Sequence, residues 1–255
     1  MILAVDIGNT NIVMGCFETD AILFRERIST NQLATELEYA SIMRTALDMH
    51  SLKAESITGA IISSVVPSIT ATVRKAIEKL TGVTAMIVGP GVKTGLSIMI
   101  DNPASLGSDQ AVDAAAAIKE YKAPMIIIDM GTATTMSVID KKKNYLGGVI
   151  MTGMAVSSDA LTKRTSQLPK IAFETPKKVI GTNTVDCMKS GIMYSTACSI
   201  DGLIERMEEE LGESCTVIAT GGLASLIVPL CKRDIILDED LLLKGLMVIY
   251  NKNNT

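Results

Sequence analysis

The sequence predicts an α/β protein of two related domains, each a mixed β-sheet covered by helices. The main observation is a short motif, aspartate, spacer and glycine closely followed by threonine, which begins at Asp6 and again at Asp129, 123 residues later (129 minus 6) in a chain of 255 residues. Each copy opens three strand-like stretches that give way to alternating helical and strand patterns. We therefore expect one domain over residues 1–118 and a second over 119–255.

The first copy of the motif follows five apolar residues, Met1–Val5, that are typical of a strand buried on both faces. Gly8 lets the backbone approach a ligand, and the polar residues after it offer side-chain donors beside backbone N–H groups. Such a loop can bind a phosphate, with Asp6 placed to hold a hydrated metal ion. Taken alone, however, the same residues are more often an ordinary hairpin turn.

The rest of the first half alternates strand and helix patterns. Pro67 suits the first turn of a helix, and apolar spacing predicts an earlier helix over 30–50 with Leu33, Leu37, Ile42 and Leu47 on its buried side. The other expected elements are strands over 12–17, 21–28, 57–66 and 84–88, and helices over 68–80 and 105–121.

The helix over 105–121 carries two carboxylates on one face, Asp109 and Asp113, with Ser105 or Ser108 available as its cap. Acidic residues favour helix N-termini in any case, so this pattern alone does not require a function. The preceding stretch Gly89–Gly95 ends in Lys-Thr like a phosphate-binding loop, but valine replaces the glycine before the lysine. We interpret it as a connection.

The second half repeats the three strands, with Lys141–Lys143 at a solvated turn, and then becomes mainly helical. A late strand ends in Thr220-Gly221-Gly222, which offers a surface without side chains where a nucleotide can lie. A plain strand-to-helix turn is an equal alternative. The expected elements are strands over 125–128, 136–139, 145–150 and 216–219, and helices over 155–166, 183–211 (with a break near Gly202) and 239–250.

Composition excludes several classes of function. A net charge of −4 without a large basic patch argues against nucleic acid as a partner. The apolar runs are shorter than the roughly 18 residues that span a bilayer, and no signal peptide is evident, so we expect a cytoplasmic protein without membrane contact. Five cysteines without a C-x-x-C pair argue against zinc, and His50 is the only histidine. A general base must therefore be a carboxylate, a lysine or a tyrosine.

Two such hairpins facing each other across a cleft can enclose a polyphosphate with its metal ions, which one hairpin cannot. Together with the late Thr-Gly-Gly turn, this resembles the actin, Hsp70 and sugar-kinase superfamily, whose duplicated actin-like (ribonuclease H-like) domains bind ATP between them. More closely, nearly the full length resembles the type III pantothenate kinases. Seven ordered blocks carry this resemblance: Asp6–Thr10, Ser63–Pro67, Gly89–Gly95, Asn102–Asp109, Asp129–Thr135, Gly181–Gly191 and Ala219–Gly222.

The resemblance implies transfer of the γ-phosphoryl group of ATP to the primary hydroxyl of pantothenate, the first step toward coenzyme A. It implies that Asp109 is the base, that Asp129 binds K⁺ or NH₄⁺, and that Mg²⁺ accompanies ATP near Asp6. The family forms homodimers whose substrate pocket draws on both subunits. The implied nucleotide contacts are Asp6, Ile7, Gly8, Asn9, Thr10, Asn11, Ile12, Val13, Thr132, Gly221 and Gly222. The implied pantothenate contacts are Ile100, Gly107, Ser108, Asp109, Gln110 and Thr184.

The acceptor side departs from the family pattern. The family usually reads Gly-Ala-Asp-Arg, with asparagine three residues further on, whereas here Gln110 replaces the arginine and Asp113 the asparagine. Glutamine lacks the fixed charge and the bidentate geometry of arginine. Position 100, often tyrosine in the family, is Ile100. Two alternatives follow: a kinase of the same fold for another small alcohol, or an ATP-binding regulatory protein that no longer transfers phosphate.

Overall fold

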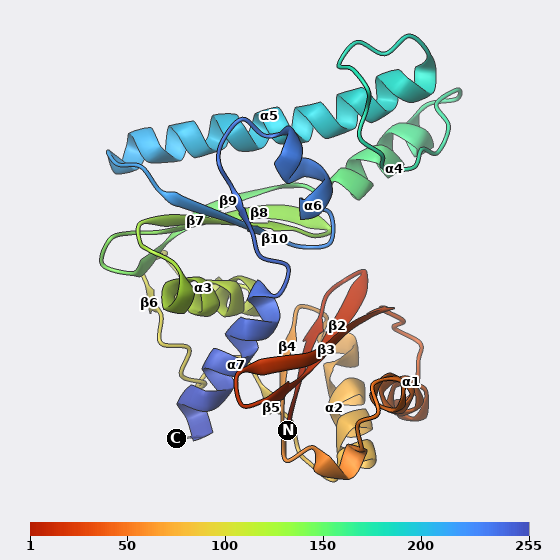
Figure 1. The fold of residues 1–255 in the computed structure, drawn as a ribbon, viewed down its shortest axis with the longest axis vertical. Helices are drawn as coiled ribbons and strands as arrows, with labels where there is room; N and C mark the ends of the chain where they lie inside the picture. Colours follow the sequence, from red (N-terminus) through yellow and green to blue (C-terminus); the bar gives the residue numbers. More distant parts are fainter. Residues whose placement is uncertain (255) are drawn as a thin grey trace. The chain divides into compact units, whose positions relative to one another are not determined.

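The computed structural model describes residues 1–254 and divides into two compact units. Unit 1 comprises residues 1–96, 102–116 and the segment from Leu241 on, and unit 2 comprises 97–101 and 117–240. Each unit contains one mixed β-sheet packed against helices, as expected (Figure 1). The division differs from the expected boundary at 118/119, because the terminal helix belongs to unit 1.

The sheet of unit 1 has the strand order β3-β2-β1-β4-β5. The first three strands form an antiparallel meander, and β4 and β5 extend it in parallel with β1. Burial of β1 on both faces explains its continuous apolar run. The strands are β1 (Ile2–Ile7), β2 (Asn11–Glu18), β3 (Ala21–Ser29), β4 (Gly59–Ser64) and β5 (Met86–Ile87).

Helices cover both faces of this sheet. One face packs against α1 (Glu36–Met49) and α2 (Pro67–Thr81), and Pro67 begins α2 as predicted. The other face packs against the first part of α3 (Ser108–Glu120) and against α7 (Leu241–Asn254), which lies opposite α1 and α2 in Figure 1.

The terminal helix α7 belongs to unit 1 because its apolar side is buried there. Leu243 and Ile249 join the core that contains Ala4 and Ile61 of the sheet. A Cβ atom at Gly245 would lie 2.0 Å from the carbonyl oxygen of Val112 in α3, so α7 and α3 are in very close contact. The apolar periodicity of the sequence predicted the helix, but only these contacts show that it belongs to unit 1.

The predicted apolar side of α1 is confirmed only at Leu47, because Leu37 and Ile42 are exposed. The helix starts at Glu36 rather than at residue 30, because Thr35 and Glu38 form a capping box: each side chain accepts a hydrogen bond from the other's backbone N–H. Leu33 therefore lies outside the helix and is 92% exposed. The buried side is formed by Tyr39, Met43 and the predicted Leu47, which are spaced by four residues.

The helix α3 is also shorter than predicted, since it begins at Ser108 instead of near Ser105. A separate 3₁₀ turn, Pro103–Ser105, precedes it, and the Asn102 side chain caps that turn by accepting from the N–H of Ala104. As a result, Asp109 lies in the first turn of α3.

The sheet of unit 2 has the strand order β11-β10-β7-β8-β9-β6. Apart from β6, the strand order matches that of unit 1. Strands β7, β8 and β9 form an antiparallel meander, and β10 and β11 extend the sheet on the other side of β7, in parallel with it. The duplication inferred from two short motifs therefore extends to the whole sheet. The strands are β6 (Ser97–Ile98), β7 (Met125–Met130), β8 (Ala133–Ile139), β9 (Asn144–Thr152), β10 (Thr216–Thr220) and β11 (Ile236–Leu237).

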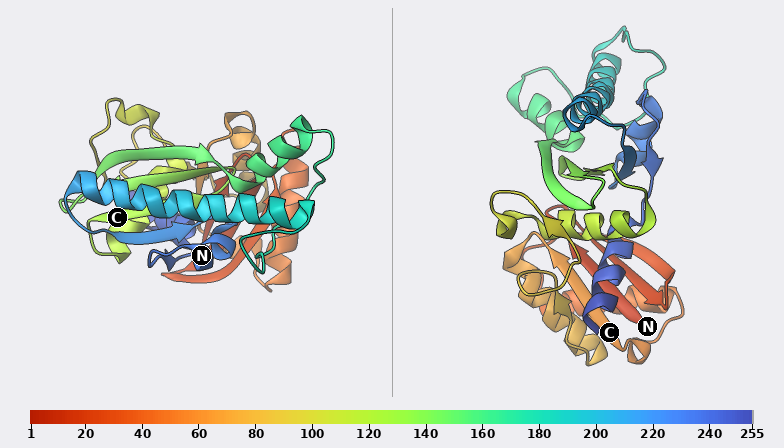
Figure 2. Two further views of the ribbon diagram at one scale, coloured as in Figure 1. Left: turned by 90° about the horizontal axis from the view of Figure 1, so that it is seen from above. Right: turned by 90° about the vertical axis from the view of Figure 1, so that its left-hand side faces the viewer.

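The helices of unit 2 are α4 (Met154–Arg164), α5 (Thr184–Leu211) and the short α6 (Ala224–Ile227). Figure 2 shows α5 running alongside the strands of unit 2 as one straight helix, so the predicted break near Gly202 is absent. Its buried side, which includes Ile192, Met193 and Ile200, packs on the sheet. Within residues 1–254, none of the helices has both the length and the apolar character needed to cross a membrane.

Candidate functional site

A buried carboxylate ends the central strand of unit 1. Asp6 is the penultimate residue of β1, pairs in register with Val13 of β2 and Ser63 of β4, and is 8% exposed. In α/β sheets, ligands bind outside the carboxyl ends of the strands. Asp6 therefore occupies the position that the sequence predicted for it.

The loop after Asp6 is held by hydrogen bonds from the end of β3. Thr30 donates its hydroxyl to the carbonyl oxygen of Gly8 at 2.6 Å and its N–H to the carbonyl oxygen of Thr10 at 2.9 Å. Within the loop, the N–H of Gly8 donates to the carbonyl oxygen of Asn11 at 3.0 Å. Thr30 was not among the residues predicted for this site, although a hydroxyl residue directly after the third strand was a usable signal.

The residues of this first hairpin differ in what they can offer a ligand. Asn9 and Thr10 are exposed, whereas Gly8, Asn11 and Val13 are partly buried. The side chains of the two isoleucines, Ile7 and Ile12, are fully buried in the core. Ile7 and Ile12 could therefore contact a nucleotide only through their backbone.

The hairpin of unit 2 repeats this geometry. Asp129 ends the central strand β7 and pairs in register with Thr135 of β8 and Thr220 of β10, as Asp6 pairs with Val13 and Ser63. The N–H of Gly131 donates to the carbonyl oxygen of Ala133 at 3.0 Å, as that of Gly8 does to Asn11, although the second turn is one residue shorter. Each unit thus combines an aspartate with a hydroxyl residue on the neighbouring parallel strand.

The Thr-Gly-Gly turn after β10 lies directly against Asp129. Gly221 has φ +94°, and a Cβ there would lie 2.5 Å from Oδ1 of Asp129 and 2.6 Å from the N of Met130. Only glycine fits this backbone conformation and this close approach. The structure therefore brings Gly221 and Asp129 together, while Gly222 and Thr132 are exposed.

The predicted base, Asp109, is oriented by its own helix. Its Oδ1 accepts a hydrogen bond from the N–H of Gln110 at 2.8 Å. A Cβ at Gly107 would lie 2.5 Å from that Oδ1, so the bare glycine makes room for the Asp109 carboxylate, whereas the distance to Oε1 of Gln110, 3.5 Å, is an ordinary contact. Burial raises the pKa of Asp109, although hydrogen bonds from the backbone N–H groups of Gln110 and Asp109 oppose the shift. The carboxylate is therefore a stronger proton acceptor than an ordinary aspartate.

Two neighbours of Asp109 complete this part of unit 1. Asp113 lies one turn further along α3, on the same side as predicted, and is 3% exposed. The hydroxyl of Ser108 is hydrogen-bonded to Ser63 and Ser64 at the carboxyl end of β4, beside the strand that carries Asp6. The end of β1 and the start of α3 therefore lie at the same edge of the sheet.

Two predicted acceptor residues lie elsewhere in unit 2. Ile100 follows β6 and lies beside Gly147, near the beginning of β9. The strand register places this part of β9 toward the amino end of β7, whereas Asp129 is at the carboxyl end. Thr184 is exposed at the first residue of α5, where the Asn183 side chain caps the helix by accepting from the N–H of Asp186.

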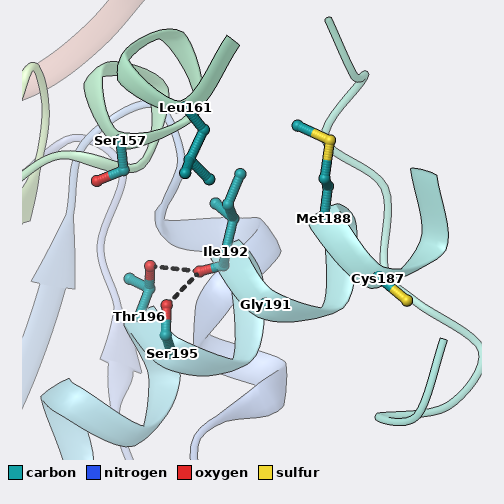
Figure 3. Close-up of a pocket in the computed structure, with 8 residues that line it drawn as sticks. All are labelled: Ser157, Leu161, Cys187, Met188, Gly191, Ile192, Ser195 and Thr196. Atoms are coloured by element: carbon teal, nitrogen blue, oxygen red, sulfur yellow. Dashed lines mark hydrogen bonds between the residues drawn. The ribbon is translucent and has the colours of Figure 1, made fainter. Parts of the chain in front are cut away.

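Two surface grooves do not coincide with these carboxylates. One, of about 520 Å³, runs along α2, and the other, of about 390 Å³, lies between α4 and α5 (Figure 3). In the second groove Ser195 and Thr196 both donate to the carbonyl oxygen of Ile192, at 3.2 and 2.8 Å. These bonds engage both hydroxyl groups within the helix.

The candidate metal ligands of the described residues are isolated carboxylates and do not form a cluster. Within residues 1–254, no three or more His, Cys, Asp or Glu side chains gather closely enough to hold a metal ion. Asp6 and Asp129 supply hard oxygen ligands of the kind that Mg²⁺ and K⁺ prefer. Mg²⁺ usually keeps several waters and binds one or two carboxylates together with substrate phosphates, so these donors fit a nucleotide-bound ion.

Two sheets of matching strand order, each with an Asp-x-Gly hairpin on its central strand, define an actin-like fold. The fold is shared with the activator of the 2-hydroxyisocaproyl-CoA dehydratase from Clostridium difficile, solved with bound ADPNP: the TM-score is 0.59 at 15% identity, covering 99% of this chain and 95% of that one. The family model for type III pantothenate kinase matches residues 2–206. The chain belongs to this family.

Relatives named type III pantothenate kinase match over nearly the whole chain. The protein from Halalkalibacterium halodurans is 45% identical over 253 residues, which cover 99% of this chain and 100% of that protein. The protein from an Exiguobacterium species is 43% identical over 253 residues, with 99% of each covered. Family membership thus confirms the expected class of enzyme, a kinase that uses ATP.

Proposed function

We propose that this protein transfers the γ-phosphoryl group of ATP to the primary hydroxyl of pantothenate and forms 4'-phosphopantothenate, the first step of coenzyme A biosynthesis. The observation that carries the proposal is the Asp109 carboxylate, fixed at 2.8 Å by the N–H of Gln110 at the sheet edge where Asp6 ends β1. The acceptor is inferred from relatives of that name, which are 41–45% identical to nearly all of the chain.

The phosphates of ATP are bound by the first hairpin, Asp6–Val13, and by Thr132 of the second. Asp6 would hold Mg²⁺, Asp129 would bind the monovalent cation, K⁺ or NH₄⁺, and Gly221 and Gly222 would line the nucleoside. In phosphoryl transfer, positioning and neutralisation of the phosphate charge account for most of the catalysis. The buried carboxylate of Asp6, the partly buried carboxylate of Asp129 and the close approach of Gly221 to Asp129 support these assignments.

Asp109 accepts the proton of the acceptor hydroxyl as that oxygen attacks phosphorus. General base catalysis of this kind contributes about 10²–10⁴-fold, or about 3–5 kcal/mol. Burial supports the role because it raises the pKa of Asp109 and so strengthens the base. Asp113, one turn deeper in α3, is a supporting residue rather than the base.

The pantothenate contacts that we propose in unit 1 are Gly107, Ser108, Asp109 and Gln110. The resemblance also implies Ile100 and Thr184 of unit 2, although Ile100 lies at the end of its sheet opposite to Asp129. We further propose a homodimer whose substrate pocket draws on both subunits. Exposed apolar side chains in unit 2 suit such a contact: Ile150, Val179 and Ile180 are 75%, 59% and 79% exposed. Sedimentation analysis of the purified protein tests the dimer directly.

The kinase assay combines ATP, Mg²⁺, K⁺ or NH₄⁺, and pantothenate, with mass spectrometry of the product. We expect 4'-phosphopantothenate and stoichiometric ADP. If neither cation supports formation of this product, the proposal is wrong.

A second candidate function is a kinase for another small alcohol. It is favoured by Gln110, a neutral amide beside the predicted base, where the family usually has arginine. A panel of alcohols in the same assay distinguishes the two, because the preferred acceptor has the highest kcat/KM. Gln110→Arg, run in parallel, should then raise kcat/KM for pantothenate. Nucleotide binding without any turnover would instead indicate the regulatory alternative.

A further inference from the structure

Two thiol groups from distant parts of the sequence approach each other in unit 2. Cys198 is exposed near the middle of α5, and Cys231 is a partly buried residue that follows the 3₁₀ turn Val228–Leu230. The two cysteines are 33 positions apart in the sequence (231 minus 198). The proposed transfer reaction uses neither of them.

The side chain of Asp201 holds the segment of Cys231 against α5. Its Oδ2 accepts a hydrogen bond from the N–H of Lys232 at 2.8 Å, and its Oδ1 accepts one from the N–H of Arg233 at 3.1 Å. The guanidinium of Arg233 then donates to Oε1 of Glu208, which lies seven residues beyond Asp201 in the same helix. The segment from Cys231 to Arg233 therefore runs along α5 in the direction of the helix.

This direction places Cys231 on the same side of the Asp201 contact as Cys198. Cys198 precedes Asp201 by three residues, which puts both on one helix face, about 4.5 Å apart along the axis. Cys231 has an extended backbone and precedes Lys232 by one residue, which is about 3.5 Å of chain. Two steps of similar length from one hydrogen-bonded contact thus bring the two cysteines next to each other.

The electrostatics of Cys231 agree with this placement. Burial raises the pKa of the Cys231 thiol to about 12, and the negative charges of the Asp201 carboxylate and of a Cys198 thiolate contribute to the increase. The thiol of Cys231 also donates to the carbonyl oxygen of Ile227 at 3.5 Å. Cys231 is therefore protonated at rest, and the exposed Cys198 is the thiol that an oxidant reaches first.

We propose that Cys198 and Cys231 form a reversible intramolecular disulfide, with a low-molecular-weight disulfide as the oxidant. The Cys198 thiolate attacks one sulfur of the oxidant and expels the first small thiol. The Cys231 thiol then attacks the Cys198 sulfur of this mixed disulfide, releases its proton to solvent and expels the second small thiol. The two protein thiols are oxidised and the oxidant is reduced to two thiols, so the bridge reports the redox state around the protein.

The bridge would join the two ends of a segment that contains β10 and the Thr220-Gly221-Gly222 turn. Closing a loop of this length stabilises a protein mainly by restricting the unfolded chain. We therefore expect formation of the bridge to raise the Tm by about 5 °C or more. A Tm that does not rise would show that the native fold does not accommodate the bridge, and would overturn the inference.

The test treats the whole protein with oxidised glutathione and maps its thiols by mass spectrometry after digestion in acid. We expect one linked pair of peptides, which joins Cys198 to Cys231 and disappears on reduction with dithiothreitol. Cys16 and Cys215 should stay reduced, because both are buried and burial raises the pKa of each thiol to about 11. These readouts are covalent, so they do not depend on whether the protein phosphorylates pantothenate.

Three serine variants separate the two steps of the exchange. Cys231→Ser should stop at a mixed disulfide on Cys198, and Cys198→Ser should leave Cys231 reduced. Cys187→Ser is the matched control: Cys187 is another exposed thiol of α5, eleven residues or about 16 Å before Cys198, so its loss should not prevent the bridge.

Three results would overturn the inference. One is a mixed disulfide that persists on Cys198 in the wild type, because Cys231 then does not reach it. Another is a link from Cys198 to any other cysteine or to a second molecule. The third is a Cys198 thiol that does not react at all.

Discussion

Replacing Gly221 with alanine adds only one methyl group, but it should strongly disturb the second hairpin. The added Cβ would lie 2.5 Å from Oδ1 of Asp129 and within 2.6 and 2.7 Å of two backbone atoms of Met130. Backbone atoms cannot rotate away, so the turn or the end of β7 must shift. Since Asp129 is the proposed cation ligand, we expect Gly221→Ala to weaken binding of ATP as well as folding.

The size of the effect can be worked from two contributions. A non-glycine residue at positive φ costs about 1–2 kcal/mol, and forcing an extra carbon into a packed site costs about 1–3 kcal/mol. The free energy of unfolding should therefore fall by about 2–5 kcal/mol in Gly221→Ala.

Gly212→Ala is the matched control in the same unit. Gly212 has φ +71° at the end of α5, but a Cβ there meets nothing within 4 Å, so only the conformational cost applies. Urea denaturation should show a smaller loss for Gly212→Ala, and calorimetry should show unchanged ATP binding. If the two variants are equally stable and both bind ATP like the wild type, the close approach of Gly221 to Asp129 is wrong.

Four further predictions concern other parts of the molecule. Because burial raises the pKa of Asp109, kcat/KM should fall on acidification at a higher pH than an ordinary aspartate would give, as a pH profile can show. The raised pKa also means that the charged carboxylate destabilises the folded protein, so the free energy of unfolding of the wild type falls relative to that of Asp109→Asn as pH rises through this pKa. Asp109→Asn should therefore be no less stable than the wild type in urea at neutral pH. Thr35→Ala removes the capping box of α1 and should cost about 1 kcal/mol in urea denaturation without changing kcat. Asp129→Asn should abolish the activation of kinase turnover by K⁺ or NH₄⁺, and equal activation in variant and wild type would contradict that ligand assignment.

The sequence was informative where local signals decide the structure. Apolar runs that end in Asp6 and Asp129 predicted two equivalent hairpins, and the strand order of both sheets confirms the duplication. Pro67 marked the start of α2 because its ring suits the first turn. The position of α1 was also readable, since Thr35 and Glu38 have the capping-box spacing, but the apolar pattern alone placed the start too early.

The remaining features depend on contacts between distant parts of the chain. The bonds of Ser108 join residues 44 and 45 positions apart, and no periodicity predicts such a pair. The approach of Gly221 to Asp129 likewise follows from pairing of β10 with β7. The two-residue strands β6 and β11 are too short to leave a pattern in the sequence.

The most direct test of the central claim compares wild type and Asp109→Asn in pantothenate-dependent ADP formation, with ATP affinity measured separately. We predict that kcat falls at least about a hundredfold in the variant, because the base is lost, while the Kd for ATP stays the same. An Asp109→Asn variant whose kcat remains within about tenfold of wild type would contradict the account.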